Sequence, residues 1–298
     1  MSIQEAERLA RERQDARRAR DFATADLLRE RIRALGFDVV DTAVGFELRP
    51  VAAPLGPPAH AASTDVTSVV EEPPMHDASV HWLVQGWPED VARGIESFDR
   101  WSSDPTIQHV VVEAWNGEAR WPGAPEVVRV RPDIGWGAAR NAGLRRSLGR
   151  VVVVVDGSVE ATGDVVSPLV AALRDPTIGV TGPFGIVTDD LREFRESAGP
   201  EVDAIEGYLM AFRRDLLGRG IRFDEKFRFY RSADIELSFQ IKALGLRAVV
   251  TDVPVMKREQ RMWAATPEER RAQLSKRNFY RFLDRWRGRT DLLVGGGT

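Results

Sequence analysis

The sequence predicts an α/β protein built on a mostly parallel sheet flanked by helices. Five consecutive valines, 151–155, form an uninterrupted β-branched run, which is typical of a strand buried on both faces. A segment with helical spacing, 138–145, comes shortly before this strand. Earlier in the chain, a strand at 80–84, a helix from Pro88 and a strand at 110–112 predict a right-handed crossover with parallel pairing.

The elements after the valines continue the α/β pattern. The spacing predicts, in chain order, a helix at 164–173, strands at 178–181, 208–212 and 248–251, and an amphipathic helix at 275–288. A polar segment, 183–207, precedes the second of these strands. We expect it to be a loop that covers a site.

The composition is that of a globular protein. Of the 298 residues, 43% are hydrophobic and 29% are charged, and the formal net charge of −3 predicts no general affinity for nucleic acid or acidic membranes. The absence of cysteine excludes disulfides, thiolate nucleophiles and cysteine-bound zinc. The first residues are too charged for a signal peptide, and the longest aliphatic run is too short to span a membrane, so we expect a cytoplasmic protein.

Residues 1–49 are predicted to form a separate small module. Two helices lie within 3–35, Asp21 is a good N-cap for the second, and short strands follow at 37–40 and 46–49. The order and spacing of RQDARRARDFATADLLRERIRALGFDVVDTAVGFELR resemble the small C-terminal module of cysteinyl-tRNA synthetases.

This resemblance implies contact with tRNA or another RNA, and the arginines of the first helix would pair with phosphates. The alternative is a helical hairpin that contacts protein and whose arginines are solvated, which the balance of acids and bases in the segment favours. Because the synthetase catalytic domain is absent, we expect no aminoacylation. Residues 50–77 are rich in proline, alanine and serine, and we expect a mobile linker before a main domain at 78–298.

An acidic residue stands where the valine strand ends. Asp156 begins the sequence Asp-Gly-Ser, and open α/β sheets bind ligands at the carboxyl ends of their strands. On spacing alone, Asp156 either binds a ligand or only starts a turn.

The Asn-Ala-Gly motif at 141–143, the glycine before the valine strand and Asp156 after it resemble the core of family-2 glycosyltransferases, which have the Rossmann-like GT-A fold. The resemblance implies that Asp156 binds a nucleotide-sugar donor, with Arg140 and Asn141 near it. In the family the ends of the first two strands hold the nucleotide base. Here Glu113 could accept a hydrogen bond from the base and Trp87 could stack on it, or both only pack at the rim.

A second match lies in Phe-Asp-Glu at 223–225, the aromatic residues after it and Asp234, which opens a helix. The family has its catalytic base at the position of Asp234. The chemistry favours the same residue, because an inverting transfer needs a carboxylate to take the acceptor proton, and the first turn of a helix keeps a carboxylate ionised. The alternative is an aspartate that only starts the helix.

The metal ligands of the family are incomplete in this chain. The resemblance implies Mg²⁺ or Mn²⁺ as cofactor with Asp156 as a ligand, but the second ligand position is Ser158 and the usual later histidine is missing. We therefore expect reduced metal dependence. Lys257, Arg258 and Arg261 stand where cations could meet the diphosphate, or they are surface bases.

These features predict an inverting glycosyltransferase that moves a sugar from a nucleotide-sugar donor to an unidentified acceptor. The alternative is a non-catalytic adaptor, in which a degenerate glycosyltransferase fold and the module at 1–49 bind RNA or protein. The departures at the metal positions favour the adaptor, whereas Asp156, Asp234 and the Gly-rich helix favour the enzyme.

Overall fold

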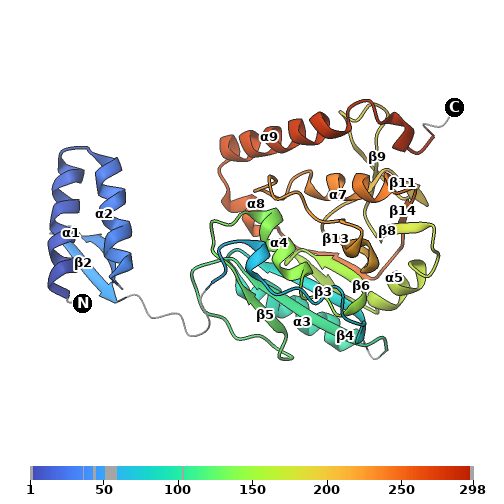
Figure 1. The fold of residues 1–298 in the computed structure, drawn as a ribbon, viewed down its shortest axis with the longest axis horizontal. Helices are drawn as coiled ribbons and strands as arrows, with labels where there is room; N and C mark the ends of the chain where they lie inside the picture. The colour runs from blue at the N-terminus through green and yellow to red at the C-terminus, as the bar shows by residue number, and fades with distance from the viewer. Residues whose placement is uncertain (1–2, 36, 43–44, 51–58, 103, 296–298) are drawn as a thin grey trace. The chain divides into compact units, whose positions relative to one another are not determined.

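The computed structural model describes residues 3–35, 37–42, 45–50, 59–102 and 104–295. The chain divides into two compact units, residues 1–58 and 59–298, which are drawn in Figure 1. No helix in these described ranges is long and apolar enough to cross a bilayer.

The smaller unit is the predicted pair of helices followed by a β-hairpin. Its elements are α1 (Ile3–Arg18), α2 (Phe22–Ala34), β1 (Phe37–Thr42) and the antiparallel β2 (Gly45–Pro50). Asp21 caps α2 as expected, since its carboxylate accepts bonds from the Thr24 N–H at 3.1 Å and the Thr24 hydroxyl at 2.7 Å. Its core contains Leu9, Ala10, Leu28, Ile32 and Val39. The resemblance of this unit to the synthetase module stays a prediction.

The larger unit is built on an eight-stranded sheet with the order β11-β14-β8-β13-β6-β3-β4-β5. Its strands are β3 (His76–Val84), β4 (Ile107–Glu113), β5 (Glu126–Arg129), β6 (Gly149–Val155), β8 (Ile178–Gly182), β11 (Glu201–Val202), β13 (Leu209–Arg213) and β14 (Arg247–Val250). Strands β5, β4, β3 and β6 are parallel to one another, as are β8 and β14. The mostly parallel sheet with GT-A-like topology is therefore confirmed.

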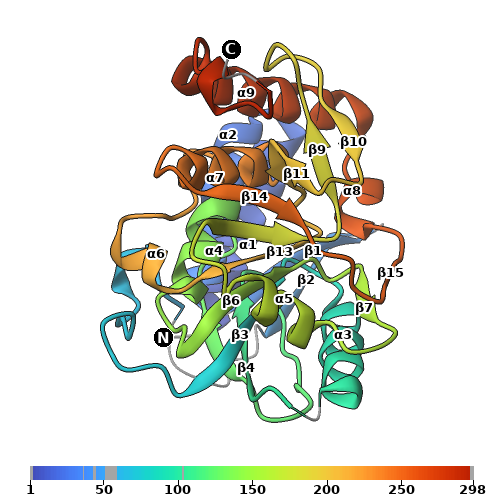
Figure 2. The same cartoon turned by 90° about the vertical axis from the view of Figure 1, so that its right-hand side faces the viewer.

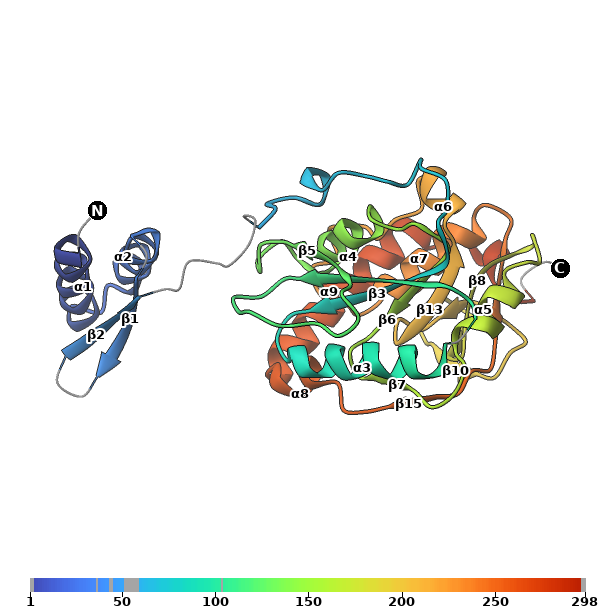
Figure 3. The same cartoon turned by 90° about the horizontal axis from the view of Figure 1, so that it is seen from below.

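Helices cover both faces of this sheet, with α3 on one face and α4, α7 and α9 on the other (Figure 3). The helices of the unit are α3 (Pro88–Trp101), α4 (Trp136–Leu144), α5 (Val166–Ala172), α6 (Asp215–Gly218), α7 (Ala233–Lys242), α8 (Arg261–Ala265) and α9 (Glu268–Trp286). Helix α9 lies outside α7 (Figure 2). Short 3-10 turns, η1 (Ser63–Asp65) and η2 (Thr290–Leu292), complete the helical segments.

The valine strand β6 lies at the centre of the sheet and is buried on both faces, as the sequence predicts. Val151, Val153 and Val155 pack in the cluster that includes α3 and α5. Val152 and Val154 point the other way, into the cluster that includes α7 and α9. A strand apolar on both sides therefore joins the two cores.

The antiparallel strand β13 lies between β6 and β8, and it positions the site. Its first residue, Leu209, is paired with Val155, the last residue of β6. The Asp156 N–H continues this pairing by donating to the Tyr208 carbonyl oxygen at 2.9 Å. The approach to β13 therefore lies beside the carboxyl end of the central strand.

Part of the segment 50–77, which was expected to be a mobile linker, is packed in the structure. Residues 51–58 lie outside the described ranges, but residues 59–75 pack against the larger unit. The Val69 N–H donates to the Arg145 carbonyl oxygen at 2.8 Å, and Val66 is buried against the edge of the sheet and α4. A segment without periodicity can still be fixed when a few apolar side chains and its backbone groups find partners. The larger unit thus begins at Ala59 rather than Ala78.

The polar segment at 183–207 contains short strands instead of a plain loop. They are β9 (Gly185–Val187), β10 (Arg195–Ser197) and β12 (Ala204–Ile205), which form a small sheet, together with β11 of the main sheet. A further two-stranded sheet pairs β7 (Val159–Ala161) with β15 (Val255–Lys257). This second pairing brings residues after β14 back to the end of β6.

Candidate active site

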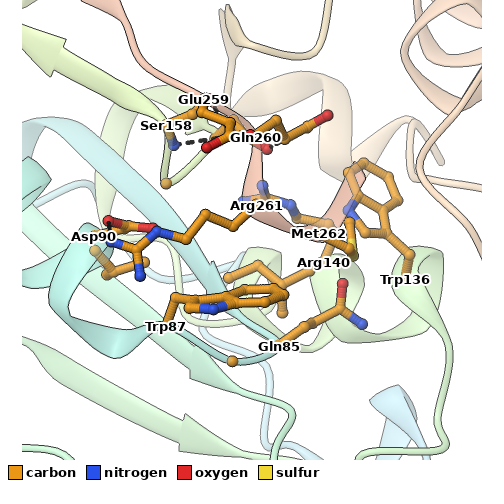
Figure 4. A pocket seen from close by; sticks show the side chains of 15 residues that line it. Gln85, Trp87, Asp90, Trp136, Arg140, Ser158, Glu259, Gln260, Arg261 and Met262 are labelled. Carbon is orange, nitrogen blue, oxygen red and sulfur yellow. Dashed lines mark hydrogen bonds and ion pairs between the residues drawn. The ribbon is translucent and has the colours of Figure 1, made fainter. Parts of the chain in front are cut away.

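A narrow cleft opens at the carboxyl ends of β3 and β6, with a cavity volume of about 60 Å³. The segment after β3 supplies one wall, α4 another, and residues 259–262 cover the third (Figure 4). Its lining includes Gln85, Trp87, Asp90, Trp136, Arg140, Asp156, Ser158, Glu259, Gln260 and Arg261. Ligands bind open α/β sheets at such an edge, where the carboxyl ends of parallel strands meet.

Asp156 is held in the cleft by a small hydrogen-bonded cluster. Its Oδ1 accepts from the Ser158 N–H at 2.9 Å and the Ser158 hydroxyl at 2.5 Å. Its Oδ2 accepts from Gln260 Nε2 at 2.9 Å. Ser158 is buried, and together with Gln260 it fixes the orientation of the Asp156 carboxylate. The side chains that orient Asp156 in this cluster are thus uncharged.

The donor set does not fit a dedicated divalent metal site. A hard cation takes several oxygen ligands and prefers carboxylates, but both oxygens of Asp156 already accept protein hydrogen bonds. The other two members of the cluster are the neutral side chains of Ser158 and Gln260. Among the described residues, no group of three or more Asp, Glu or His side chains is arranged to hold a metal.

Arg140 is a buried cation beside this cluster. Its two Nη atoms donate to the carbonyl oxygens of His81 at 3.1 Å and Val155 at 3.0 Å, so neither is neutralised by a carboxylate. Its Nε is buried and finds no partner in the described part of the chain. Burial lowers the pKa of Arg140 to about 10, while attraction to Asp156 opposes that shift. The guanidinium also lies over the Trp136 ring, at 5.2 Å from its centroid.

The three later bases take separate places. Arg261 lines the cleft and reaches across it to Asp90, at 3.0 Å, and it also pairs with Glu89 at 2.5 Å (Figure 4). Arg258 is instead paired with Glu160, on the strand after the cluster. That Glu160 carboxylate also pairs with Arg93, and its pKa is lowered because these arginines outweigh the effect of burial.

Lys257 lies away from the cleft lining, in a cage of two rings and a carboxylate. Its Nζ is 3.6 Å from the centroid of Phe184 and 4.0 Å from that of Tyr208. Glu206 lies 3.6 Å from the same ammonium. Burial raises the pKa of Glu206, and Lys257 opposes the shift.

Asp234 opens α7 after Ser232, whose φ of 65° turns the chain into the helix. Its Oδ2 accepts from the Gly207 N–H at 2.7 Å, and its Oδ1 accepts from the Ile235 N–H at 2.9 Å. Burial raises the pKa of Asp234, and the hydrogen bonds from Gly207 and Ile235 oppose that rise. A carboxylate with a raised pKa binds a proton more readily than a solvated one.

Two consecutive residues link Asp156 and Asp234. The Tyr208 carbonyl oxygen accepts from the Asp156 N–H, and the Gly207 N–H donates to Asp234. Both carboxylates also raise the pKa of the Tyr208 hydroxyl, in addition to the effect of its burial. The approach to β13 therefore contacts the backbone of Asp156 and the side chain of Asp234, two residues far apart in the sequence.

Residues 117–236 match the family model described as Glycosyl transferase family 2. This segment contains Arg140, Asp156, Ser158 and Asp234 and ends before Gln260 and Arg261. No curated protein matches the chain.

Two solved structures are similar to the chain. The crystal structure of GalNAc-T7 with UDP, GalNAc and Mn²⁺ has a TM-score of 0.57 and 18% identity, over 71% of this chain and 48% of that one. The mannosyltransferase PcManGT from Pyrobaculum calidifontis, in complex with GDP-Man and Mn²⁺, has a TM-score of 0.49 and 21% identity, over 74% of this chain and 67% of that one. This chain thus spans about half of the GalNAc-T7 chain, and that likeness supports the GT-A fold.

Two residues that the family-2 resemblance placed near the donor lie elsewhere. Asn141 donates to the Phe223 carbonyl oxygen at 2.8 Å and accepts from the Phe223 N–H at 3.0 Å, so it fastens the 223–225 segment to α4. Glu113 is buried and paired with Arg129 at 2.8 Å and Trp121 at 2.9 Å. Neither lines the cleft.

Sequence reasoning missed Gln260 and the Gly207–Tyr208 link. Gln260 comes three residues after β15, in the region where the family usually has its later histidine. A glutamine amide, however, does not mark its residue as part of a site in a sequence. Gly207 lies between a predicted loop and a predicted strand. Its role depends on Asp234, 27 positions later, which no local pattern reports.

Proposed function

We propose that the larger unit is an inverting glycosyltransferase that transfers a sugar from a nucleotide-sugar donor to an acceptor hydroxyl. The observation that carries this proposal is the pairing of a cleft at the carboxyl ends of β3 and β6 with a second carboxylate, Asp234, linked to it through Gly207 and Tyr208. The match of residues 117–236 to glycosyl transferase family 2 supports it.

In this proposal Asp234 is the general base. Asp234 takes the proton of the acceptor hydroxyl, the oxygen attacks the anomeric carbon from the face opposite the diphosphate, and the bond to the departing phosphate oxygen breaks. The raised pKa of Asp234 brings it closer to working pH, which improves a general base. The backbone N–H groups of Gly207 and Ile235 keep the carboxylate oriented.

The departing diphosphate carries negative charge that the cleft must stabilise. Arg140 is buried, its Nη atoms are bonded to carbonyl oxygens rather than to a carboxylate, and Arg261 lines the opposite wall. Fixed cations in a site with little water stabilise developing charge strongly. We propose that these two arginines have this role, with Asp156 orienting the donor. Arg258 and Lys257 lie outside the cleft lining and take no direct part.

Calorimetric titration of the full chain with UDP-sugars and GDP-sugars tests donor binding. Each titration is run with manganese and with a chelator, on wild type, on Asp156→Ala and on Asp252→Ala, which removes an exposed carboxylate outside the cleft. We expect binding that survives the chelator, falls in Asp156→Ala and stays unchanged in Asp252→Ala. Binding only with manganese contradicts the cationic site, and no binding under any condition favours the adaptor.

A further inference from the structure

A second, larger hollow lies away from the cleft, on the α4, α7 and α9 side of the sheet. It is formed by the segment 63–71, the end of α4, the segment 217–228 and the outer part of α9. Figure 3 shows the segment before β3 running past α4 and α6 on this side. Its cavity volume is about 990 Å³, against about 60 Å³ for the cleft, so it is large enough for an extended ligand. We call it the basic groove.

The basic groove is positively charged although the whole chain is negative, at −3. Among the described residues that line it, the basic side chains outnumber the acidic ones by six to three. The basic members are Arg145, Arg222, Lys226, Arg228, Arg281 and Arg285, and the acidic members are Glu71, Asp224 and Glu225. Such a local excess against the net charge favours an anionic ligand.

Arginines along α9 repeat at intervals of about one turn, and two of them, Arg281 and Arg285, line the groove. Arg277, Arg281 and Arg285 are four residues apart, which spaces them by about 6 Å along the helix. Like charges at this spacing destabilise a helix, so the repeat has no structural advantage by itself. Burial and the neighbouring Arg277 both lower the pKa of Arg281. A bound anion would relieve this repulsion.

Several of these cations have no partner of their own. Within the described ranges, no hydrogen bond or ion pair holds the side chain of Arg222, Lys226 or Arg277, and all three are exposed. The nearby acids are partly used, because Glu225 accepts bonds from Ser63 and Asn141. The buried Glu236 pairs with Arg285 at 2.5 Å from beneath. The unpaired Arg222 and Lys226 therefore line the groove on the 217–228 segment, while Arg281 and Arg285 line it on α9.

We propose that the basic groove binds phosphate groups carried on an extended ligand. Arginine forks match phosphate oxygens, and cations on the 222–228 segment and on α9 would contact phosphates from two sides. The described lining residues include no exposed aromatic ring on which a base would stack, so the phosphates rather than bases would be recognised. This site is independent of the proposed transfer reaction.

Fluorescence competition on the full chain tests the proposal. A short fluorescein-labelled oligouridylate and unlabelled tripolyphosphate serve as probes, because they carry the same phosphates on a polymer and on a small molecule. The test variant is Arg222→Ala with Lys226→Ala, two exposed bases that line the groove. Its matched control is Arg192→Ala with Lys276→Ala, two exposed bases outside the groove. Thermal melting verifies that both variants fold.

We expect the dissociation constant of at least one probe to rise more than fivefold in the groove variant and less than twofold in the control. For the oligouridylate, the logarithm of the association constant falls with the logarithm of the salt concentration. The magnitude of this slope should decrease by about 0.7 for each phosphate that the variant no longer neutralises. Displacement by tripolyphosphate identifies a small phosphorylated ligand, and binding of the oligouridylate alone identifies a nucleic-acid backbone. Equal weakening in both variants, or no binding of either probe, would overturn the proposal.

Discussion

Asp156 and Asp234 are both hydrogen-bonded to the Gly207–Tyr208 pair, but the surroundings of their carboxylates differ. Asp156 accepts hydrogen bonds from a serine hydroxyl and a glutamine amide and faces an open cleft. Asp234 accepts bonds from two backbone N–H groups, and burial raises its pKa. The first environment fixes a carboxylate in one orientation, and the second prepares it to take a proton. Environment, rather than residue type, distinguishes the two roles that we propose for these carboxylates.

The largest effect should come from removing the proposed base. We expect Asp234→Asn to lower kcat by about a thousandfold, because a well-placed general base contributes about 10² to 10⁴. Donor binding, measured by calorimetry, should change less than twofold, since Asp234 acts on the acceptor. Asp252→Asn is the matched control. Turnover in Asp234→Asn at the wild-type rate would place the base elsewhere, with Glu206 as the next candidate.

Placing a second carboxylate beside Asp156 should create a site that binds a divalent metal. In Ser158→Asp, two carboxylates would face each other, and Mn²⁺ would relieve their repulsion. At a concentration of 100 times its dissociation constant, Mn²⁺ should stabilise this variant by about 2.7 kcal/mol. The readout is the melting temperature with and without Mn²⁺, and Ser158→Asn is the uncharged control. An equal rise in wild type would mean that its site already holds the ion.

Variants of Arg261 and Arg258 test which cations contribute to donor binding in the Asp156 cleft. We expect Arg261→Ala to raise the donor dissociation constant about tenfold, equivalent to about 1.4 kcal/mol, because the variant cannot pair with a phosphate from that wall. Arg258→Ala should change it less than twofold, because that guanidinium lies outside the cleft lining. Calorimetry of both variants in chelator decides. The reverse ranking would contradict the proposed diphosphate site.

The smallest effect concerns the stability cost of Asp234. The folded protein raises the pKa of this carboxyl above its unfolded value, so folding favours the protonated form. The cost is absent below about pH 4, the unfolded pKa, and grows as pH rises through the folded pKa. The stability of Asp234→Asn relative to wild type should therefore be higher at pH 8 than at pH 3.5. Urea unfolding at both pH values measures this, and a gain of equal size at both would refute it.

Much of the fold could be predicted because its signals are local. The valine run, the helix after Pro88 and the helix that Asp234 opens each depend on periodicity within a few residues. The packing of residues 59–75 was not predicted, because it depends on two valines and scattered backbone bonds rather than on a repeat.

The site was predictable only in part, for the same reason. Asp156 and Asp234 follow from their places at the ends of elements. Their partners do not, since Gln260 lies 104 positions from Asp156 and Arg258 lies 98 from Glu160. Which of several neighbouring bases reaches which acid depends on how β15 folds back along β7, and no local pattern encodes that return.

Gly207 gives the fold a way to lose activity while every charged group stays in place. A methyl group there would meet the Asp234 side chain at 3.2 Å from Cβ and 3.3 Å from Oδ2, closer than the contact tolerates without displacement. A single alanine at this position would require the Asp234 side chain to shift by a few tenths of an ångström. An inactive descendant of such a protein could therefore retain an intact set of acids and arginines. In its sequence, only the replacement of this one glycine would indicate the loss of activity.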